Sequence, residues 1–389
     1  MKLLTVIGTR PEAIKMAPVL RAFATCEHLN SRLCVTGQHR ALLDQALTIF
    51  GLSPDIDLRV MSPDQSLNGF FARAMTALGR VLDEEAPDRV VVQGDTVSAL
   101  AGALAAFQRR IPVAHIEAGL RTFDTDNPWP EEGYRQAIDA IADQLFAPTA
   151  AAAANLGGTV GKSVHVTGNS GVDAIYGVLG RLSRDRRLRR AADAALPALP
   201  SDRPLLLATI HRRESFGEPL RQICAALARI AAGRAHIVLP VHPNPEVAGP
   251  VRTALGNRAG ITLLDPLPFP AMIRLMQRVD LVLTDSGGVQ EEAATLGTPA
   301  LVLRTVTDRP EAVAAGLARL AGTTTDAIIA ATEAELEHLR LRPLHAVSAN
   351  PFGDGHAAER IVAGLIGRPF LPFEVDGTEP PPVPIRLVG

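Results

Sequence analysis

Residues 90–107, VVVQGDTVSALAGALAAF, hold an apolar run, a Gly-Asp-Thr turn and an alanine-rich stretch. The β-branched run predicts a buried strand, and the alanine-rich stretch predicts the helix that follows it. A strand that leads through a short turn into a helix is the repeating unit of a parallel α/β sheet. This stretch therefore favours an α/β fold, and the rest of the chain repeats its pattern.

Short apolar runs alternate with longer helical patterns over most of the chain. Because 389 residues exceed one ordinary domain, the pattern predicts two Rossmann-like domains in tandem, residues 1–170 and 171–354. In the first domain we expect strands at 3–7, 33–36, 90–93, 113–116, 144–147 and 163–166. In the second we expect strands at 205–209, 236–240, 261–264, 281–284 and 300–303.

Composition excludes several classes of partner and site. The formal net charge of −2 argues against nucleic acid as a partner. Three scattered cysteines argue against a disulfide framework or a structural zinc site and suit a reducing cytoplasm. The start of the chain lacks the long apolar region of a signal peptide, and no stretch has the length of a membrane span. We therefore expect a cytoplasmic protein with no membrane or metal.

Two segments stand outside the α/β pattern. Residues 181–203 contain a run of arginines, for which a solvated helix face is favoured over a site for an anionic partner. Residues 368–389 are rich in proline and predict an extended tail.

The candidate site is sought where strands end, because open α/β sheets bind ligands at the carboxyl ends of their strands. We expect the two domains to direct these ends into one cleft. The first such segment is GTRPEAIK, residues 8–15, in which Thr9 and Glu12 have the spacing of a capping box. Arg10 and Lys15 lie near the start of this helix, where an anion is favoured.

Carboxylates follow the next two strands of the first domain. Asp95 follows 90–93, and either a catalytic group or a helix N-cap explains it equally well. Glu117 follows 113–116, where a carboxylate is costly unless it is paired or catalytic. Glu131 and Glu132 open the next helix, where the helix dipole alone explains Glu132. Arg135 is placed to pair with Glu131 at i,i+4.

Two motifs of the second domain indicate a site for an anion. In TIHRRESFG, residues 209–217, His211 lies between a strand end and two arginines, so its protonated form is disfavoured and it could transfer protons near neutral pH. In residues 285–288, DSGG, the glycines let backbone N–H groups approach a phosphate at a helix start. Neither a Walker motif nor GxGxxG is present. A nucleotide-sugar enzyme therefore fits better than a kinase or a dehydrogenase.

The motifs together resemble one family. GTRPEAIKMAP, TGQHR, QGDT, HIEAGLRT, PWPEEGYR, HRRESFG, LTDSGGVQEEA and TDRPEAV occur in the order of the non-hydrolysing UDP-N-acetylglucosamine 2-epimerases, over roughly residues 1–365. The resemblance implies two Rossmann-like domains of the glycosyltransferase-B type with the active site between them. A C-terminal helix at about 355–367 would cross back to the first domain, and the second domain would bind UDP. It also implies a homodimer that needs no metal or other cofactor.

The resemblance further implies the reaction. UDP-GlcNAc and UDP-ManNAc would interconvert by loss of the C2 proton and of UDP from C1, through 2-acetamidoglucal, followed by re-addition from the other face. The product would supply ManNAc for cell-surface polysaccharide. One face of C2 needs a base and the other an acid. By motif, the catalytic residues would be Asp95, Glu117, Glu131 and His211, and the substrate contacts Arg10, Lys15, Arg135, Ser286, Gly287, Gly288, Glu292 and Arg309.

Many members of this family bind a second UDP-GlcNAc as an activator. The residues that match that site are Gln38, Gln65, Arg212, Glu214 and His242. Ala41 and Asp64 stand where the family has glutamine and arginine, and Asp64 would repel a diphosphate. We therefore predict weakened or absent activation by UDP-GlcNAc.

Three other functions remain open: a glycosyltransferase of the same fold, a hydrolysing epimerase that releases ManNAc and UDP, and a sensor that binds nucleotide-sugars without turnover. The sensor is disfavoured, because binding alone has no use for three acids at strand ends and helix starts.

Overall fold

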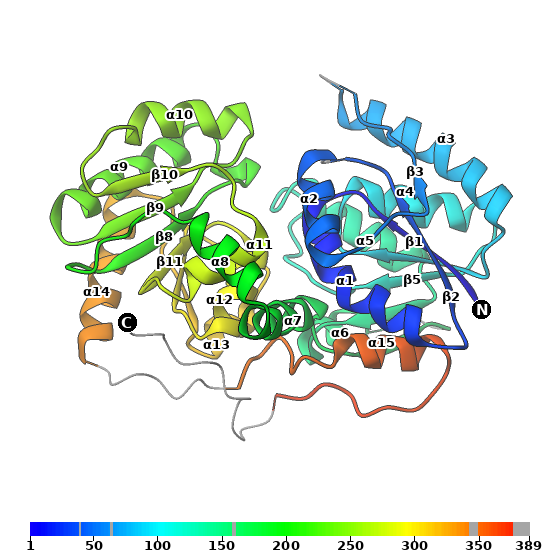
Figure 1. Cartoon of the computed structure of the whole chain (residues 1–389). Coiled ribbons are helices and arrows are strands. Elements are labelled where there is room, and N and C mark those ends of the chain that lie inside the picture. The colour runs from blue at the N-terminus through cyan, green and yellow to red at the C-terminus, as the bar shows by residue number, and fades with distance from the viewer. Residues whose placement is uncertain (39, 63–64, 158–160, 342–348, 376–389) are drawn as a thin grey trace. The chain divides into compact units, whose positions relative to one another are not determined.

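The computed structural model describes residues 1–38, 40–62, 65–157, 161–341 and 349–375. The chain divides into two compact α/β units (Figure 1). Unit 1 comprises Met1–Gly177 and Phe352–Val375, and unit 2 comprises Val178–Pro351. The boundary lies within helix α7 (Ser170–Arg184), seven residues after the predicted position.

Unit 1 is built on a parallel sheet of seven described strands. Their order is β3-β2-β1-β4-β5-β6-β7, so the direction of winding reverses between β1 and β4. The strands are β1 (Lys2–Ile7), β2 (Asn30–Val35), β3 (Ile56–Asp57), β4 (Arg89–Gln93), β5 (Val113–Ile116), β6 (Gln144–Ala147) and β7 (Ser163–Val166). All six strands predicted for this half are confirmed, and only the two-residue β3 was not predicted.

Helices cover the sheet of unit 1 because its central strands are buried throughout. α3, α4 and α5 pack together against one face, where alternate residues of β1 and β4, including Leu4 and Val90, join their apolar core. α1 packs against α2 and against α15. The helices are α1 (Arg10–Thr25), α2 (Arg40–Phe50), α3 (Leu67–Glu85), α4 (Val97–Phe107), α5 (Glu131–Ile141), α6 (Ala150–Asn155), α7 and α15 (Ala357–Leu365).

Unit 2 repeats this architecture. Its parallel sheet has the order β10-β9-β8-β11-β12-β13, with the reversal between β8 and β11. The strands are β8 (Leu205–Thr209), β9 (His236–Pro240), β10 (Ile261–Leu264), β11 (Leu281–Thr284), β12 (Ala300–Val302) and β13 (Ala318–Leu320). The helices are α8 (Arg186–Ala194), the 3₁₀ turn η1 (Arg213–Ser215), α9 (Glu218–Gly233), α10 (Pro245–Leu255), α11 (Phe269–Met276), α12 (Gly287–Leu296), α13 (Pro310–Ala314) and α14 (Thr325–Leu341). Of these strands, only β13 was not predicted.

The strand orders fix the place of the site in each unit. In doubly wound sheets, ligands bind outside the carboxyl ends of the two strands at which the winding reverses. In unit 1 these strands lead into the GTRP and GDT segments, and in unit 2 into the HRRE and DSGG segments. Four of the motifs that were singled out in the sequence therefore follow the four strands that flank the reversals, whereas Glu117 follows β5.

The chain returns to unit 1 at its end. α15 belongs to unit 1, and Asp173 of α7 accepts hydrogen bonds from the Ala357 and Ala358 amides at its start. Of the predicted tail, residues 368–375 pack on unit 1: Phe373 is buried and its N–H donates to the Val166 carbonyl at 3.0 Å. Residues 376–389 lie outside the described part of the chain.

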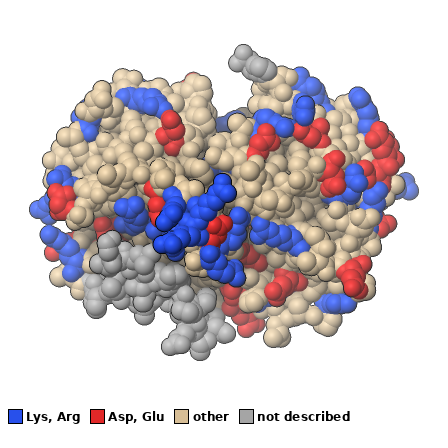
Figure 2. Space-filling view, viewed as in Figure 1, with Lys and Arg blue, Asp and Glu red and all other residues tan. Residues whose placement is uncertain are grey.

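The arginine run forms an exposed basic surface. Figure 2 shows Lys and Arg side chains gathered over α7 and α8, where Arg184, Arg186, Arg187 and Arg190 are exposed. This agrees with the interpretation of the run as a solvated helix face. None of the helices in the described residues combines the length and hydropathy that a membrane span requires.

Candidate active site

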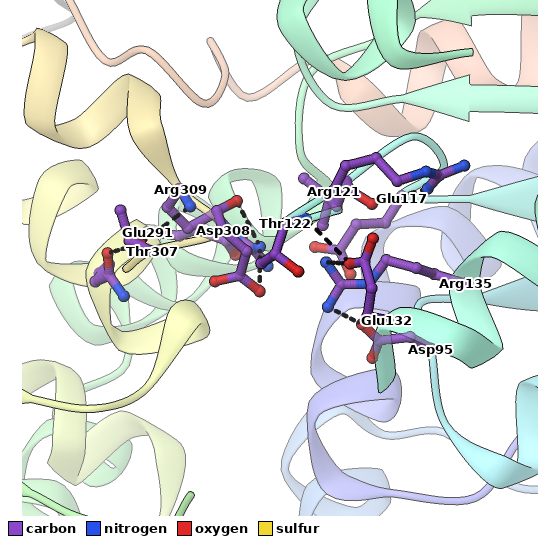
Figure 3. A network of polar contacts seen from close by, with 12 residues as sticks. Asp95, Glu117, Arg121, Thr122, Glu132, Arg135, Glu291, Thr307, Asp308 and Arg309 are labelled. Atoms are coloured by element: carbon purple, nitrogen blue, oxygen red, sulfur yellow. Dashed lines mark hydrogen bonds and ion pairs between the residues drawn. The ribbon is translucent and has the colours of Figure 1, made fainter. Parts of the chain in front are cut away.

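Asp95 pairs with an arginine instead of capping a helix. Thr96 is the N-cap of α4, and its hydroxyl accepts from the Ala99 amide at 3.0 Å. The carboxylate of Asp95 is left for Arg135 Nη2, at 2.7 Å (Figure 3). Of the two interpretations of Asp95, the N-cap is therefore wrong. Residues 40 positions apart meet because β4 and α5 bring them together.

Glu117 is held by side chains from three other elements. Its carboxylate contacts the Lys15 ammonium from α1, and it accepts from Gln93 Nε2 at 2.6 Å and from Asn169 Nδ2 at 3.3 Å. Only 9% of the side-chain surface is exposed. Its φ of 70° lies in the left-handed region, which a residue with a Cβ rarely adopts and which is concentrated at functional sites. Lys15, assigned to the substrate from the sequence, thus also contacts a candidate catalytic acid.

The two acids that open α5 differ in burial. Glu131 is the first residue of the helix and is partly buried. Glu132 is fully buried and accepts from the amides of Thr122 at 3.1 Å and Phe123 at 3.2 Å, so it anchors the loop before the helix (Figure 3). Arg135 lies 3.6 Å from Glu132. Glu132 is therefore structural, as predicted, although the loop amides explain it better than the helix dipole. The pairing of Arg135 with Glu131 stays a prediction.

The GTRP segment forms the predicted capping box. Thr9 caps α1, and Glu12 accepts from the amides of Gly8 and Thr9 at 3.0 and 2.8 Å. The same carboxylate accepts from the Thr96 hydroxyl at 2.9 Å, so it joins the loops after β1 and β4. Burial raises the pKa of Glu12 to about 7, although these donors favour the carboxylate. Arg10 is the first residue of α1, at the helix start that was predicted to face an anion.

In unit 2, a buried aspartate holds the histidine loop. Asp285, at the end of β11, accepts from the amides of His211 and Arg212 at 3.0 Å and from the Ser215 hydroxyl at 2.8 Å. The ring of His211 stacks on that of His242, with centroids 5.7 Å apart. Burial lowers the pKa of His211, with Arg212 and His242 acting in the same direction and Asp285 opposing them. The neutral imidazole that was predicted from the sequence is thus favoured.

The DSGG segment opens α12 as predicted. Ser286 is the N-cap, with its hydroxyl accepting from the Val289 amide at 3.3 Å. A Cβ on Gly287 would lie 3.4 Å from Arg212 Nη2 and from Asp308 Oδ1, whereas one on Gly288 would meet little beyond Ser286 Oγ at 4.0 Å. Because Gly287 has no side chain, Arg212 and Asp308 can approach its backbone closely. Gly288 leaves open space at the helix start, where backbone N–H groups bind anions.

A buried charge network surrounds the start of α12. Arg309 contacts the Glu291 carboxylate and lies 3.1 Å from Asp308, and Asp308 also lies 3.3 Å from Arg304 (Figure 3). Arg304 in turn lies 3.1 Å from Glu214. Glu291 therefore holds an arginine of the site. Glu292 is partly buried in the second turn of α12, and its contact with the ligand stays a prediction.

The residues matched to an activator site divide between the units. In unit 1, Gln38 accepts from the Ser98 hydroxyl at 2.9 Å, and Gln65 accepts from the Ser62 amide at 2.9 Å. Arg212, Glu214 and His242 belong to the unit 2 network. Ala41 is exposed on α2, and Asp64 lies outside the described residues. The grouping of these five residues into one site stays a prediction.

Comparison with known proteins supplies the family. The model of the UDP-N-acetylglucosamine 2-epimerase family matches residues 21–366. The chain belongs to this family. The UDP-N-acetylglucosamine 2-epimerases of Salmonella typhimurium and Escherichia coli (strain K12) are each 44% identical over 369 residues, which cover 94% of this chain and 98% of each relative.

Solved structures of epimerases match the fold of this chain. The UDP-GlcNAc 2-epimerase from Neisseria meningitidis, bound to UDP-GlcNAc, matches with a TM-score of 0.89 at 39% identity and covers 95% of this chain and 100% of that one. The enzyme from Methanocaldococcus jannaschii, in complex with UDP-GlcNAc and UDP, matches with a TM-score of 0.84 at 32% identity, over 94% and 100% of the two chains. The resemblance, the two Rossmann-like domains of the glycosyltransferase-B type and the assignment to an isomerase family are confirmed.

Four acidic or basic residues of this epimerase-family chain were not assigned to the site from the sequence. Asp285 and Asp308 hold loops of unit 2, and His115 and Asp139 form a buried pair in unit 1. Asp285 had a signal, a carboxylate directly after a predicted strand. His115 and Asp139 had none, because they are 24 positions apart, whereas the partners of Asp308, Arg304 and Arg309, are close to it in the sequence. Among the described residues, no group of three or more His, Cys, Asp or Glu side chains is placed to hold a metal ion.

Proposed function

We propose that the protein interconverts UDP-GlcNAc and UDP-ManNAc by inverting the configuration at C2. Its family and the names of its relatives support this activity, and the geometry around Glu117 carries it. A nearly buried glutamate whose backbone lies in the left-handed region is a strained arrangement of the kind that is concentrated at functional sites. It suits a group that must take up or release a proton.

The proposed reaction is an elimination followed by an addition. A carboxylate of unit 1 takes the proton from C2 while the C1–O bond to UDP breaks, and the electron pair of that bond leaves with UDP. The product, 2-acetamidoglucal, accepts a proton at C2 on its other face, and the UDP oxygen bonds to C1 again. Asp95, Glu117 and Glu131 supply the acid and the base. Arg135, paired with Asp95 at 2.7 Å, holds that carboxylate in place.

Unit 2 supplies the nucleotide site in this proposal. Departing diphosphate needs positive charge that is already in position. The start of α12 offers Ser286, Gly287 and Gly288, and Arg309 lies beside it in the charge network. The neutral ring of His211 can share a proton with a phosphate oxygen. The solved relatives that hold UDP-GlcNAc and UDP support a nucleotide-sugar as the ligand.

Incubation with UDP-GlcNAc in D₂O tests the proposal. Proton NMR and mass spectrometry should show UDP-ManNAc, with deuterium at C2 of both epimers. Free ManNAc with UDP would indicate the hydrolysing alternative, and transfer to an added acceptor would indicate a glycosyltransferase. An unchanged spectrum would leave only the binding sensor. Each of these three results contradicts the proposal in a different way.

We also propose the setting of the reaction. The enzyme would work in the cytoplasm as a homodimer and supply ManNAc for cell-surface polysaccharide. Sedimentation velocity tests the dimer, and loss of ManNAc-containing polysaccharide on deletion of the gene tests the role. A single species with the mass of the monomer, 41.2 kDa, would contradict the dimer.

A further inference from the structure

A buried histidine and aspartate lie behind the candidate catalytic acids of unit 1. His115, on β5, is fully buried, and Asp139, on α5, is 3% exposed. His115 Nδ1 lies 2.6 Å from Asp139 Oδ1, and His115 Nε2 lies 2.8 Å from the Gly94 carbonyl oxygen. Neither residue has a part in the reaction proposed above.

Both ring nitrogens of His115 face oxygen atoms. One is a backbone carbonyl oxygen, which can only accept, and the other belongs to the Asp139 carboxylate. Burial opposes ionisation of Asp139, but the charges of His115 and Arg121 overcome it and keep the pKa of Asp139 below its usual value. A hydrogen bond to an ionised carboxylate is shorter and stronger than one between neutral groups.

Both ends of the pair bind backbone next to a candidate acid. On the His115 side, Gly94 directly precedes Asp95, and its amide donates to the Ile116 carbonyl at 2.9 Å. On the Asp139 side, Oδ2 accepts from the Gly119 amide at 3.2 Å and contacts Arg121 at 2.6 Å. Gly119 lies two residues after Glu117, and its tight approach to the Ala152 carbonyl leaves no room for a Cβ.

Asp139 lies on α5, the helix that also contains the third candidate acid, Glu131. Glu131, Arg135 and Asp139 follow one another at i,i+4 spacing, so one face of α5 presents all three. Arg135 reaches Asp95, and Asp139 reaches His115 and the loop after Glu117. Three segments with candidate acids are thus tied to one buried ion pair.

We propose that His115 and Asp139 are positioning residues of the reaction, which set the backbone at Gly94 and Gly119 and thereby place Asp95 and Glu117 against the sugar. This inference rests on the proposed epimerase activity. The pair touches no reacting atom, so it acts on the chemical step through the two carboxylates and leaves the nucleotide site of unit 2 unchanged.

Two substitutions of the histidine separate its two hydrogen bonds. The amide of His115→Asn can replace Nδ1 and keep the bond to Asp139, but it cannot reach Gly94. The amide of His115→Gln can replace Nε2 and keep the bond to Gly94, but it gives up the bond to Asp139. Asp139→Asn removes the charge from the other side. A misplacement near 1 Å costs about 10²-fold in rate, so we expect kcat to fall about 10- to 100-fold in each variant.

Asp143→Asn is the matched control. Asp143 pairs with Arg89 at 2.7 Å and accepts from the Val113 amide at 2.9 Å, so it joins β4 and β5 at their first residues, the ends away from the acids. Its loss should lower the melting temperature and leave kcat close to that of the wild type. UDP affinity, from calorimetry, should stay within about twofold in all four variants, because the defect lies in the chemical step.

The wild type is assayed first, in D₂O. If it does not place deuterium at C2, the proposed function fails. If it turns over but the His115 and Asp139 variants keep as much kcat as Asp143→Asn, the positioning role is wrong. It is also wrong if their loss appears in KM and in UDP affinity with kcat unchanged. Should His115→Asn prove unfolded by circular dichroism, His115→Gln and Asp139→Asn decide between the same two results.

Discussion

At the scale of single residues, three glutamates of unit 1, two buried and one nearly buried, differ in what their carboxylates bind. Glu12 accepts from two amides and from the hydroxyls of Thr9 and Thr96, and Glu132 accepts from two amides of the preceding loop. These two carboxylates hold backbone. Glu117 is held through the side chains of Lys15, Gln93 and Asn169. Side chains can move with a substrate, so Glu117 is the acid best suited to proton transfer.

Glu117→Gln should therefore abolish most of the activity. The change keeps the shape of the side chain and removes the proton-transfer group, whose contribution is typically about 10²–10⁴-fold in rate. Steady-state kinetics should show this loss in kcat, while calorimetry shows unchanged UDP affinity. Asp126→Asn, at an exposed loop residue of the same segment, is the control and should keep full activity. Equal activity of the two variants would contradict a catalytic role for Glu117.

At the scale of elements, most strands could be predicted because a buried parallel strand is a continuous apolar run. β3 has only two residues, both partly buried, and two of the three residues of β13 are exposed, so neither is a buried apolar run. The loops were harder to predict. Thr96, and not Asp95, caps α4, and the difference depends on the Arg135 side chain from a helix that begins 35 residues later. Local propensity cannot distinguish these two outcomes.

The turn after β1 should tolerate no side chain at Gly8. A Cβ there would lie 2.0 Å from Ser98 Oγ and 2.3 Å from Thr36 Oγ1. Gly8→Ala should lower the free energy of unfolding by about 1–3 kcal/mol, as overpacking does. Gly133→Ala is the matched control, because a Cβ on this helical glycine meets nothing within 4 Å, and it should stabilise by about 0.5–1 kcal/mol. Chemical denaturation measures both, and a neutral Gly8→Ala would contradict the prediction.

The contact between α7 and α15 should depend on pH. Burial raises the pKa of Asp173 from 3.8 to about 6, while the two amides of α15 oppose this shift. A carboxyl whose folded pKa is raised contributes stability below the unfolded pKa, and that contribution is lost as the pH rises through the folded value. Between pH 4 and 7, the wild type should therefore lose about 2 kcal/mol relative to Asp173→Asn, which does not titrate. Denaturation at several pH values measures this, and a constant difference would contradict it.

At the scale of the whole molecule, two units with one architecture carry different chemistry. Both place their polar motifs after the strands at which the winding reverses, β1 and β4 in unit 1 and β8 and β11 in unit 2. Acids and amides follow in unit 1, and a helix start with arginines follows in unit 2. The proposed elimination of UDP needs both kinds of group, so we expect that one unit alone does not support turnover.

Activation by a second UDP-GlcNAc should be weak or absent. Where the family resemblance leads us to expect a glutamine and an arginine, this chain has Ala41, which has no amide side chain, and Asp64, which has no positive charge. The initial rate should therefore depend hyperbolically on the substrate concentration, whether the substrate is UDP-GlcNAc or UDP-ManNAc. Sigmoidal kinetics that disappear in Arg212→Ala would contradict this, because Arg212 is one of the residues matched to that site.

The sequence by itself determined the α/β class, the two Rossmann-like units, eleven of the described strands and the family, since these depend on local patterns and on the order of motifs. It also indicated which acids follow strands. Only the tertiary structure decided which groups each acid contacts. Asp95 with Arg135, His115 with Asp139 and Asp285 with the His211 loop are pairs separated by 24 to 74 residues. The hydrogen bonds and ion pairs of a buried group depend on which residues lie near it in space, and the linear sequence does not state which distant residues those are.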